Sequence, residues 1–253
     1  MSDIALQLYS IRERIASDGL APSLARAASA GFDRIELFNL VAWADELRTE
    51  LPANGIAVPT AHARLLGEDQ DAIFATAASL GVQTIIDPFT EPEHWATRDG
   101  VLRIADHLNA SAAGARQHGL ALGYHNHAWE AESIIDGTTA LEVLADALDP
   151  EVVLEVDAYW AAVGGADVPA LLRSLGSRVV ALHLKDAPIV DGALSKDRHD
   201  QLPVGEGAID WAAILEAAPT AELLIVEFDE YRGDIFDGAA TSLAGIRALT
   251  TAR

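Results

Sequence analysis

Residues 152–160 read VVLEVDAYW, a short apolar run that ends on the carboxylate of Asp157. The run is too short for a globular helix, and it is typical of a strand in a parallel sheet that is buried on both faces. Two later runs have the same shape, because residues 179–185 (VVALHLK) carry His183 near their end and residues 223–227 (LLIVE) close on Glu227. One polar residue at a strand end is usually a cap or a satisfied polar group. Three at matching places predict that Asp157, His183 and Glu227 converge at the carboxyl end of one sheet.

These three side chains are the ligand types of a divalent-metal site. The chain contains no cysteine, which excludes disulfides, thiolate zinc sites and cysteine nucleophiles together. Any metal must therefore be held by carboxylate and imidazole groups. The motifs GxSxG, Walker A, HExxH and the EF-hand loop are also missing from the sequence, so the serine hydrolase and phosphoryl transfer templates fail.

Strand-like and helix-like stretches alternate along the whole sequence. Strands are predicted at residues 5–9, 34–38, 57–61, 84–87, 121–125, 152–157, 179–184 and 223–228. Helices are predicted at 20–30, 43–54, 71–80, 98–118, 138–148, 168–175, 211–218 and 242–250. Several helices are followed by a glycine suited to a C-cap, namely Gly31, Gly55, Gly81, Gly119 and Gly176. Eight units with short returns favour the α/β class and a single-domain (β/α)8 TIM barrel over residues 1–253, since no GxGxxG follows the first strand.

Composition limits the partners. Half of the 253 residues are hydrophobic, the formal net charge is -22, and the apolar runs are too short to cross a bilayer. Because a chain with this negative charge repels polyanions, we expect neither a nucleic acid nor a membrane as a partner. The N-terminus lacks the pattern of a signal peptide, which predicts a cytoplasmic protein. A homo-oligomer is compatible with these features.

Polar and aromatic residues gather where the predicted strands end. In residues 122–130, LGYHNHAWE, His125 and His127 share a face and suit metal ligation or proton transfer; the alternative is a hydrogen-bonding role in a loop. Lys185 shares a face with His183, and it would either steady a substrate oxygen or pair with Asp186. The residues predicted to bind substrate are Tyr9, Glu36, His62, His127, Trp160, Lys185 and Arg198, of which Arg198 lies in a long polar return after the seventh strand.

Seven segments in this order and spacing resemble a known family. They are LQLYSIRE, GFDRIELF, YHNHAWE, LEVDAYW, HLKD, PVGEGAIDW and IVEFDEY. Together they are similar to the sugar phosphate isomerase/epimerase family, the xylose isomerase-like barrels that include ketose 3-epimerases and inosose dehydratases. The resemblance implies one divalent ion, Mn, Co or Mg, held by Glu, Asp, His and Glu from the later strands. Asp157, His183 and Glu227 match the last three positions, and His125 stands at the first in place of glutamate.

The resemblance also implies a reaction. The expected enzyme is a metal-dependent sugar isomerase or epimerase that moves a proton next to a sugar carbonyl through a metal-stabilised enediolate. Glu227 would transfer the proton, His125 or Glu130 would act across the sugar, and Lys185 would steady an oxygen. Because His125 replaces a glutamate of the usual pair, two alternatives stay open. They are a dehydratase or lyase acting on a keto sugar or keto-inositol, and a sugar-binding barrel without catalysis.

The endonuclease IV type of DNA repair enzyme shares this barrel. It would want a histidine where this chain has Trp160, and a positive surface. A small sugar or keto-sugar substrate and a single metal fit the sequence better.

Overall fold

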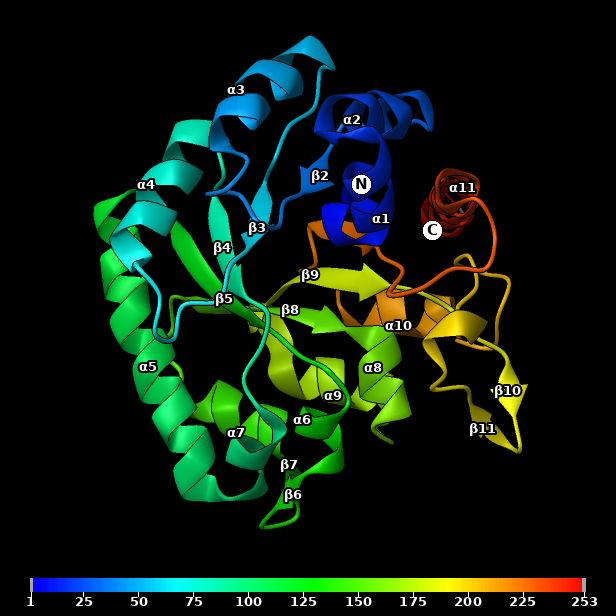
Figure 1. Cartoon of the computed structure of the whole chain (residues 1–253). Coiled ribbons are helices and arrows are strands. Elements are labelled where there is room, and N and C mark those ends of the chain that lie inside the picture. Colours follow the sequence, from blue (N-terminus) through cyan, green and yellow to red (C-terminus); the bar gives the residue numbers. More distant parts are fainter. Residues whose placement is uncertain (1, 252–253) are drawn as a thin grey trace.

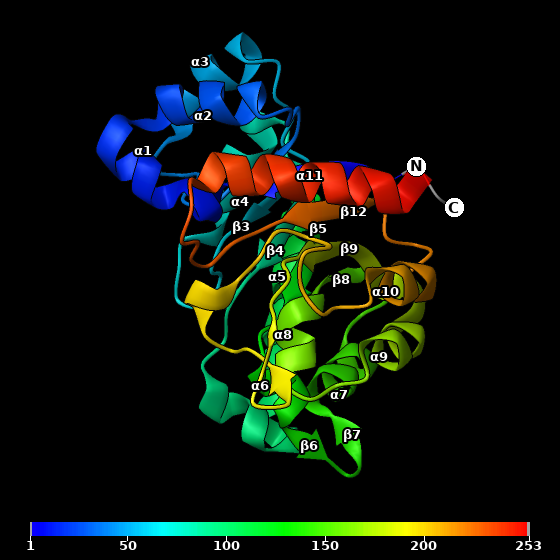
Figure 2. The same ribbon diagram turned by 90° about the vertical axis from the view of Figure 1, so that its right-hand side faces the viewer.

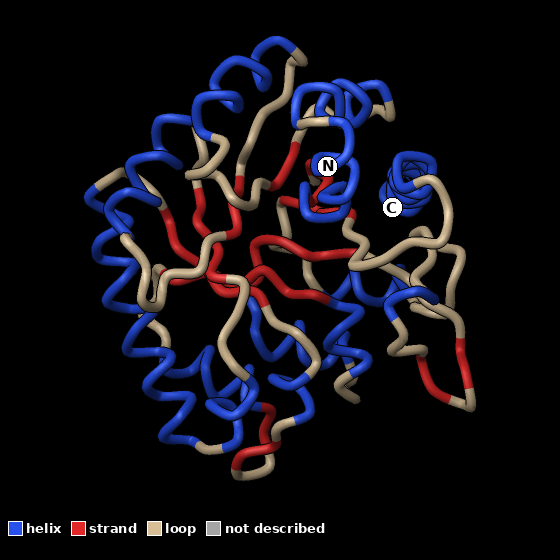
Figure 3. Tube along the Cα trace, viewed as in Figure 1, coloured by secondary structure: helices blue, strands red, loops and turns tan. Residues whose placement is uncertain are grey.

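The computed structural model describes residues 2–251, so residues 1, 252 and 253 of the predicted domain lie outside the described part. Within it, eight parallel strands form one sheet that curves into a barrel, in the order β2-β1-β12-β9-β8-β5-β4-β3. These strands are β1 Asp3–Gln7, β2 Ile35–Glu36, β3 Thr60–His62, β4 Thr84–Asp87, β5 Ala121–His125, β8 Val152–Asp157, β9 Val179–Leu184 and β12 Leu223–Val226. Figures 1 and 3 show them at the centre, with helices outside. The predicted TIM barrel is confirmed.

Helices follow the strands and cover the barrel. They are α1 Arg12–Asp18, α2 Leu20–Ser29, α3 Ala44–Ala53, α4 Gln70–Leu80, α5 Arg98–Gln117, α6 Trp129–Glu132, α7 Ala140–Ala147, α8 Ala158–Val163, α9 Val168–Leu175, α10 Trp211–Ala217 and α11 Ile235–Thr251. Side chains cap the first turns of several of them, as when Thr139 and Glu142 form a capping box on α7. Figure 2 shows α11 lying lengthwise across one side of the barrel. No described helix is long and apolar enough to cross a membrane.

The register of the parallel strands sets the height of each polar side chain. Asp157 in β8 pairs with His183 in β9, and His183 pairs with Ile225 in β12. On the other side of β8, Glu155 pairs with His125 in β5. Since side chains alternate along a strand, Glu155 and Asp157 share one face of β8, one step apart. The sheet thus presents polar groups at two successive heights.

The barrel closes between β2 and β3, where few backbone contacts join the two strands. Between β2 and β3 the structure has two isolated parallel bridges, Arg34 with Ala57 and Leu37 with Ala61. Backbone hydrogen bonds from Leu37 to Thr60 and from His62 to Leu37 complete the seam. They bring the end of β3 alongside β2.

Four strands and the helix α9 were confirmed to the residue, and the other elements differ from their predicted bounds at one or both ends. The predicted strand 5–9 stops at Gln7, because the Gln7 side chain accepts the amide of Tyr9 and starts a 3-10 turn over Leu8–Ile11. Helix α11 begins at Ile235, seven residues before its predicted start. Three short helices, α1, α6 and α8, were not predicted. The five predicted glycine caps all have positive φ, the conformation that glycine adopts at least cost.

Two small hairpins project from the barrel. Strands β6 Ile134–Ile135 and β7 Thr138–Thr139 pair around Asp136 and Gly137, and β10 Ile189–Val190 and β11 Ala193–Leu194 pair around Asp191 and Gly192. Both Asp-Gly turns have positive φ at each residue, as tight hairpin turns require. The second hairpin belongs to the long return that the sequence marks after residue 185 (Figure 1).

Candidate metal centre and cavity

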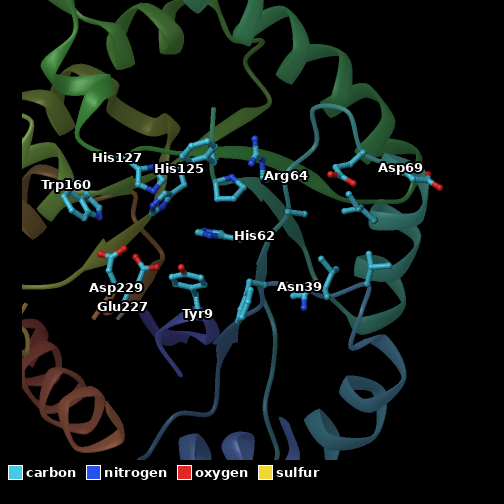
Figure 4. A pocket seen from close by; sticks show the side chains of 18 of the residues that line it. Tyr9, Asn39, His62, Arg64, Asp69, His125, His127, Trp160, Glu227 and Asp229 are labelled. Carbon is cyan, nitrogen blue, oxygen red and sulfur yellow. The ribbon is translucent and has the colours of Figure 1, made fainter. Parts of the chain in front are cut away.

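A cavity of about 800 Å³ opens at the carboxyl ends of the strands, where such barrels carry their sites. Figure 4 shows His62, His125, His127, Glu227 and Asp229 grouped at one end of it, with Tyr9 and Trp160 beside them. The far end of the cavity carries Asn39 and Asp69. The wall comprises Tyr9, Phe38, Asn39, Leu40, Val41, His62, Ala63, Arg64, Glu68, Asp69, Ala72, Ile73, Pro88, Phe89, His125, His127, Trp129, Trp160, Arg198, Glu227 and Asp229.

Four buried side chains from β5, β8, β9 and the end of β12 form what we call the outer tetrad: His125, Asp157, His183 and Glu227. They offer one ligand atom each, and these atoms lie within 4.8 Å of one another. His183 Nδ1 is 2.9 Å from Glu227 Oε2, and His125 Nε2 is 3.9 Å from Asp157 Oδ2. Asp157 Oδ1 accepts the Trp160 amide, whereas the buried Oδ2 lies 2.8 Å from the Lys185 ammonium group. Two imidazoles and two carboxylates fit a divalent cation.

A second group lies one step deeper in the barrel, and we call it the inner cluster: Glu36, His62 and Glu155. Its carboxylates meet the far side of the outer imidazoles, because Glu155 Oε1 is 2.9 Å from His183 Nε2 and 3.1 Å from His125 Nδ1. Glu36 Oε2 is 2.6 Å from His183 Nε2 and accepts a hydrogen bond from Gln7. Glu36 and Glu155 are fully buried. The sequence places His62 and Glu36 in this region, but Glu155 was not among the predicted residues.

Lys185 supplies the positive charge of the outer tetrad. Its ammonium group is fully buried, 2.8 Å from Asp157 Oδ2 and 3.3 Å from Asp229 Oδ2, and it donates to Glu227. Asp229 also accepts from Gln201, whose carbonyl oxygen in turn accepts the Asp229 amide. The predicted alternative, a simple pair with Asp186, is not what the structure shows.

Burial and neighbouring charges shift the pKa values in opposite directions. Burial raises the pKa of Asp157 to about 6, although Lys185 lies beside it. Burial alone would also raise the pKa of Glu227, but Lys185 and His183 outweigh it and hold this pKa well below its usual value. Burial lowers the pKa of His125 well below normal, which favours the neutral imidazole that binds metals. At His62 the carboxylates of Glu36 and Glu155 outweigh burial and raise the pKa to about 10.

The predicted substrate-binding residues mostly line the cavity. Tyr9, His62, His127, Trp160 and Arg198 lie in its wall. Trp160 Nε1 and His127 Nδ1 are buried there without a hydrogen-bond partner. These polar atoms are free to meet the oxygens of a ligand. Glu36 and Lys185 are buried and do not belong to the wall.

Glu130, a predicted catalytic residue, is placed differently. It does not belong to the cavity wall, and its carboxylate accepts from the Tyr124 hydroxyl at 2.7 Å and from the His127 amide at 2.8 Å. Burial raises its pKa to about 8 despite these bonds. Glu130 therefore supports β5 and the turn that holds His127.

Asp186 organises the long return that carries Arg198. Its carboxylate accepts the amides of Ala187, Gly205 and Ile209 and the indole N–H of Trp211. A Cβ on Gly207 would lie 2.1 Å from Asp186 Oδ1, so this position requires glycine. One buried carboxylate thus fixes both the start and the end of the return.

The sequence and the fold were compared with known proteins. The family described as xylose isomerase-like TIM barrel matches residues 24–249. A sugar phosphate isomerase/epimerase from Parabacteroides distasonis ATCC 8503 superimposes with a TM-score of 0.79 and 21% identity, over 98% of this chain and 94% of its own. An IolI protein with a bound zinc atom gives a TM-score of 0.70 and 16% identity, over 100% and 99% of the two chains. The probable 3-DHS dehydratase AsbF from Bacillus anthracis gives 0.68 and 18%, over 98% of each chain. No curated protein matches the sequence.

Proposed function

The chain belongs to the xylose isomerase-like TIM barrel family, and we propose that it is a divalent-metal-dependent sugar isomerase or epimerase. The observation that carries the proposal is the outer tetrad, which combines two imidazoles and two carboxylates beside the cavity. Its substrate would be a small sugar or keto sugar with a carbonyl next to a carbon that bears hydrogen and hydroxyl. The structural neighbours named as isomerase/epimerase and as a zinc-bound protein support this choice.

A divalent ion held by His125, Asp157, His183 and Glu227 would supply Lewis-acid stabilisation of the negative charge that develops when the proton leaves. Manganese, cobalt or magnesium is the expected ion, and the two imidazoles also suit zinc. The chain's own groups do the rest. Trp160 and Tyr9 wall the substrate, and the Trp160 indole N–H is free to donate to one of its oxygens.

Glu227 is the proposed proton-transfer group, because its carboxylate is ionised and borders the cavity. Lys185 holds this carboxylate in place and steadies the charge around it. His125 is the proposed second group of the proton-transfer pair, and its imidazole lies beside Glu227, with their ligand atoms within 4.8 Å of each other.

The test is solvent exchange. The purified protein, loaded with Mn²⁺, Co²⁺ or Mg²⁺, is incubated in D₂O with a panel of ketoses and keto-inositols, and substrate deuteration is followed by NMR. We expect one carbon-bound proton next to the carbonyl to exchange, and Glu227→Gln to slow exchange by at least ~100-fold. Glu230→Gln, which changes a partly exposed acid paired with Arg12, is the matched control and keeps full exchange. Sugar binding without exchange would instead identify a binding protein.

A dehydratase is the second candidate, and the acids of the cavity wall favour it. Among the described residues of this wall, the carboxylates are Glu68, Asp69, Glu227 and Asp229. Asp69 lies at the far end, and Glu227 and Asp229 lie on the same side (Figure 4). The labelled groups beside Glu227 are the imidazoles of His125 and His127 and the carboxylate of Asp229 (Figure 4). A base and a separate acid suit elimination, in which the α proton leaves, the β hydroxyl departs as water and a C=C bond forms. Mass spectrometry of the same incubations distinguishes loss of water from isomerisation.

A further inference from the structure

Four atoms at the centre of the barrel form a closed ring of alternating nitrogen and oxygen. His62 Nε2 lies 2.7 Å from Glu155 Oε1 and 3.1 Å from Glu36 Oε2. On the other side, His183 Nε2 lies 2.9 Å from Glu155 Oε1 and 2.6 Å from Glu36 Oε2. His125 Nδ1 joins the ring at Glu155. His62, His125, Glu155 and His183 therefore also have the composition of a cation site, the inner tetrad.

The nitrogen–oxygen distances in this ring indicate whether hydrogens or a cation lie between the atoms. Zinc ligands at 2.0–2.1 Å from a tetrahedral ion lie about 3.3 Å from one another. The four contacts of the ring run from 2.6 to 3.1 Å, which is the range of hydrogen bonds between N–H and carboxylate oxygen. Each Nε2 must then carry a hydrogen, because the oxygens of ionised carboxylates only accept.

His125 and His183 belong to both tetrads, and the nitrogen that donates to Glu155 determines which ring nitrogen of each is left to bind a cation. A neutral imidazole carries one N–H, so a His183 that binds a cation through Nδ1, the nitrogen 2.9 Å from Glu227 Oε2, keeps its hydrogen on Nε2. Without a cation, Nδ1 also carries a hydrogen and donates it to Glu227, because burial lowers the pKa of His183 but the carboxylates of Glu155, Glu227 and Glu36 outweigh it and raise this pKa well above its usual value. His125 is arranged in the opposite sense, since Nδ1 donates to Glu155 and Nε2 is bare toward Asp157.

We propose that Glu155 is the positioning residue of the metal centre: as the common acceptor for His125 and His183, it fixes both tautomers so that one cation binds, in the outer tetrad. The inference rests on the outer tetrad being the cation site of the proposed function. A cation in the inner tetrad would take the nitrogens that now donate to Glu155. The two sites share two imidazoles and exclude one another while these are neutral. Hydrogen-bonded carboxylates behind metal-binding histidines commonly raise metal affinity.

The experiment uses zinc as the probe and does not depend on activity. Zinc affinity is measured by competition with a chelator, and bound zinc is counted and located by anomalous diffraction. We expect one zinc per chain in the outer tetrad. Glu155→Gln keeps the shape of the side chain but cannot accept from both imidazoles through an ionised carboxylate, so we expect zinc affinity to fall 10- to 100-fold. Glu130→Gln is the matched control, because Glu130 is equally buried and contacts neither imidazole; it keeps the wild-type affinity.

The tautomers of His125 and His183 provide a second measurement, which would not depend on Glu155 if its role were only structural. In the zinc-loaded wild type, ¹⁵N spectra of labelled histidine should show His183 protonated at Nε2 and His125 at Nδ1. This measurement and the diffraction need no variant, so they hold even where Glu155→Gln fails to fold. Zinc between His62 and Glu155, two zinc ions per chain, no zinc at all, reversed tautomers, or wild-type affinity in Glu155→Gln would each overturn the inference. Zinc bound as described, with no exchange of a substrate proton, would refute the proposed function and leave this inference standing.

Discussion

The outer tetrad and the inner cluster are built by neighbouring residues of the same barrel, yet they have different surroundings. Strand β8 contributes Glu155 to the inner cluster and Asp157 to the outer tetrad, two residues apart. The outer tetrad borders the cavity and has an ammonium group among its carboxylates. The carboxylates of the inner cluster contact imidazoles and the Gln7 amide. We therefore expect similar residue types at two heights of this barrel to serve two tasks: the upper layer offers ligand atoms, and the carboxylates of the lower layer hold the imidazole N–H groups in place.

The largest effect that would test this division is at Asp157. We expect Asp157→Asn to weaken zinc affinity more than ~100-fold, because changes to mere hydrogen-bond partners of metal ligands already cost 10- to 100-fold. The asparagine oxygen can still accept the Trp160 amide that Asp157 Oδ1 accepts at the start of α8. Asp167→Asn makes the same change at the cap of α9, away from the tetrad, and should keep zinc. Zinc retained by Asp157→Asn would place the cation elsewhere.

Lys185 gives the next largest effect, on stability. Lys185→Met removes the buried cation that neutralises Asp157, Glu227 and Asp229, and we expect it to lower the free energy of unfolding without metal by ~3–5 kcal/mol. Zinc should then raise the melting temperature more in this variant than in the wild type, because the ammonium group and the cation neutralise the same carboxylates. Thermal unfolding with and without zinc measures both effects.

Lys196→Met is the control for this experiment. Lys196 is the other lysine of the chain and is exposed, so its loss should change neither quantity. A smaller zinc-induced shift in Lys185→Met than in the wild type would show that the lysine and the cation do not share these carboxylates.

A smaller effect concerns Glu130, a buried carboxylate that belongs to neither group. Its pKa is raised to about 8 in the fold, so the native state holds a proton that the unfolded chain has released. The contribution of Glu130 to stability is therefore full below pH 4.5 and is lost as the pH rises toward 8, by at most ~1.4 kcal/mol per pH unit. Urea unfolding from pH 4.5 to 8 should show a shallower decline for Glu130→Gln. Glu132→Gln, at an exposed position of the same helix α6, should keep the wild-type slope.

The sequence predicted the barrel and the outer tetrad because both follow local patterns. Apolar runs of strand length, helices between them and a polar residue at each strand end are visible without contacts, as in residues 152–157 and 179–184. The inner cluster was harder to predict. Glu155 lies inside an apolar run where alternation alone puts it on the face of Asp157, and this signal was available. Its partners His62, Glu36 and His183 lie up to 147 residues apart, and only the register of the sheet brings them together.

Other features could not be predicted, for identifiable reasons. Glu130 follows His125 and His127 closely, so it was expected in the cavity, but the turn after β5 directs its carboxylate to Tyr124. The beginning of α11 at Ile235 depends on Asp234, which accepts the Phe236 amide and pairs with Arg26 in α2. Such long-range contacts leave no periodic trace in the chain.

The carboxylate of Asp186 has a consequence for how molecules reach the interior. Because donors from Ala187, Gly205, Ile209 and Trp211 converge on it, both ends of the return that carries Arg198 are fixed to one carboxylate. Asn39 and Asp69 lie at the other end of the cavity, away from Trp160 (Figure 4), and we expect a substrate to enter on that side. The segment anchored by Asp186 would then form a fixed side of the cavity entrance.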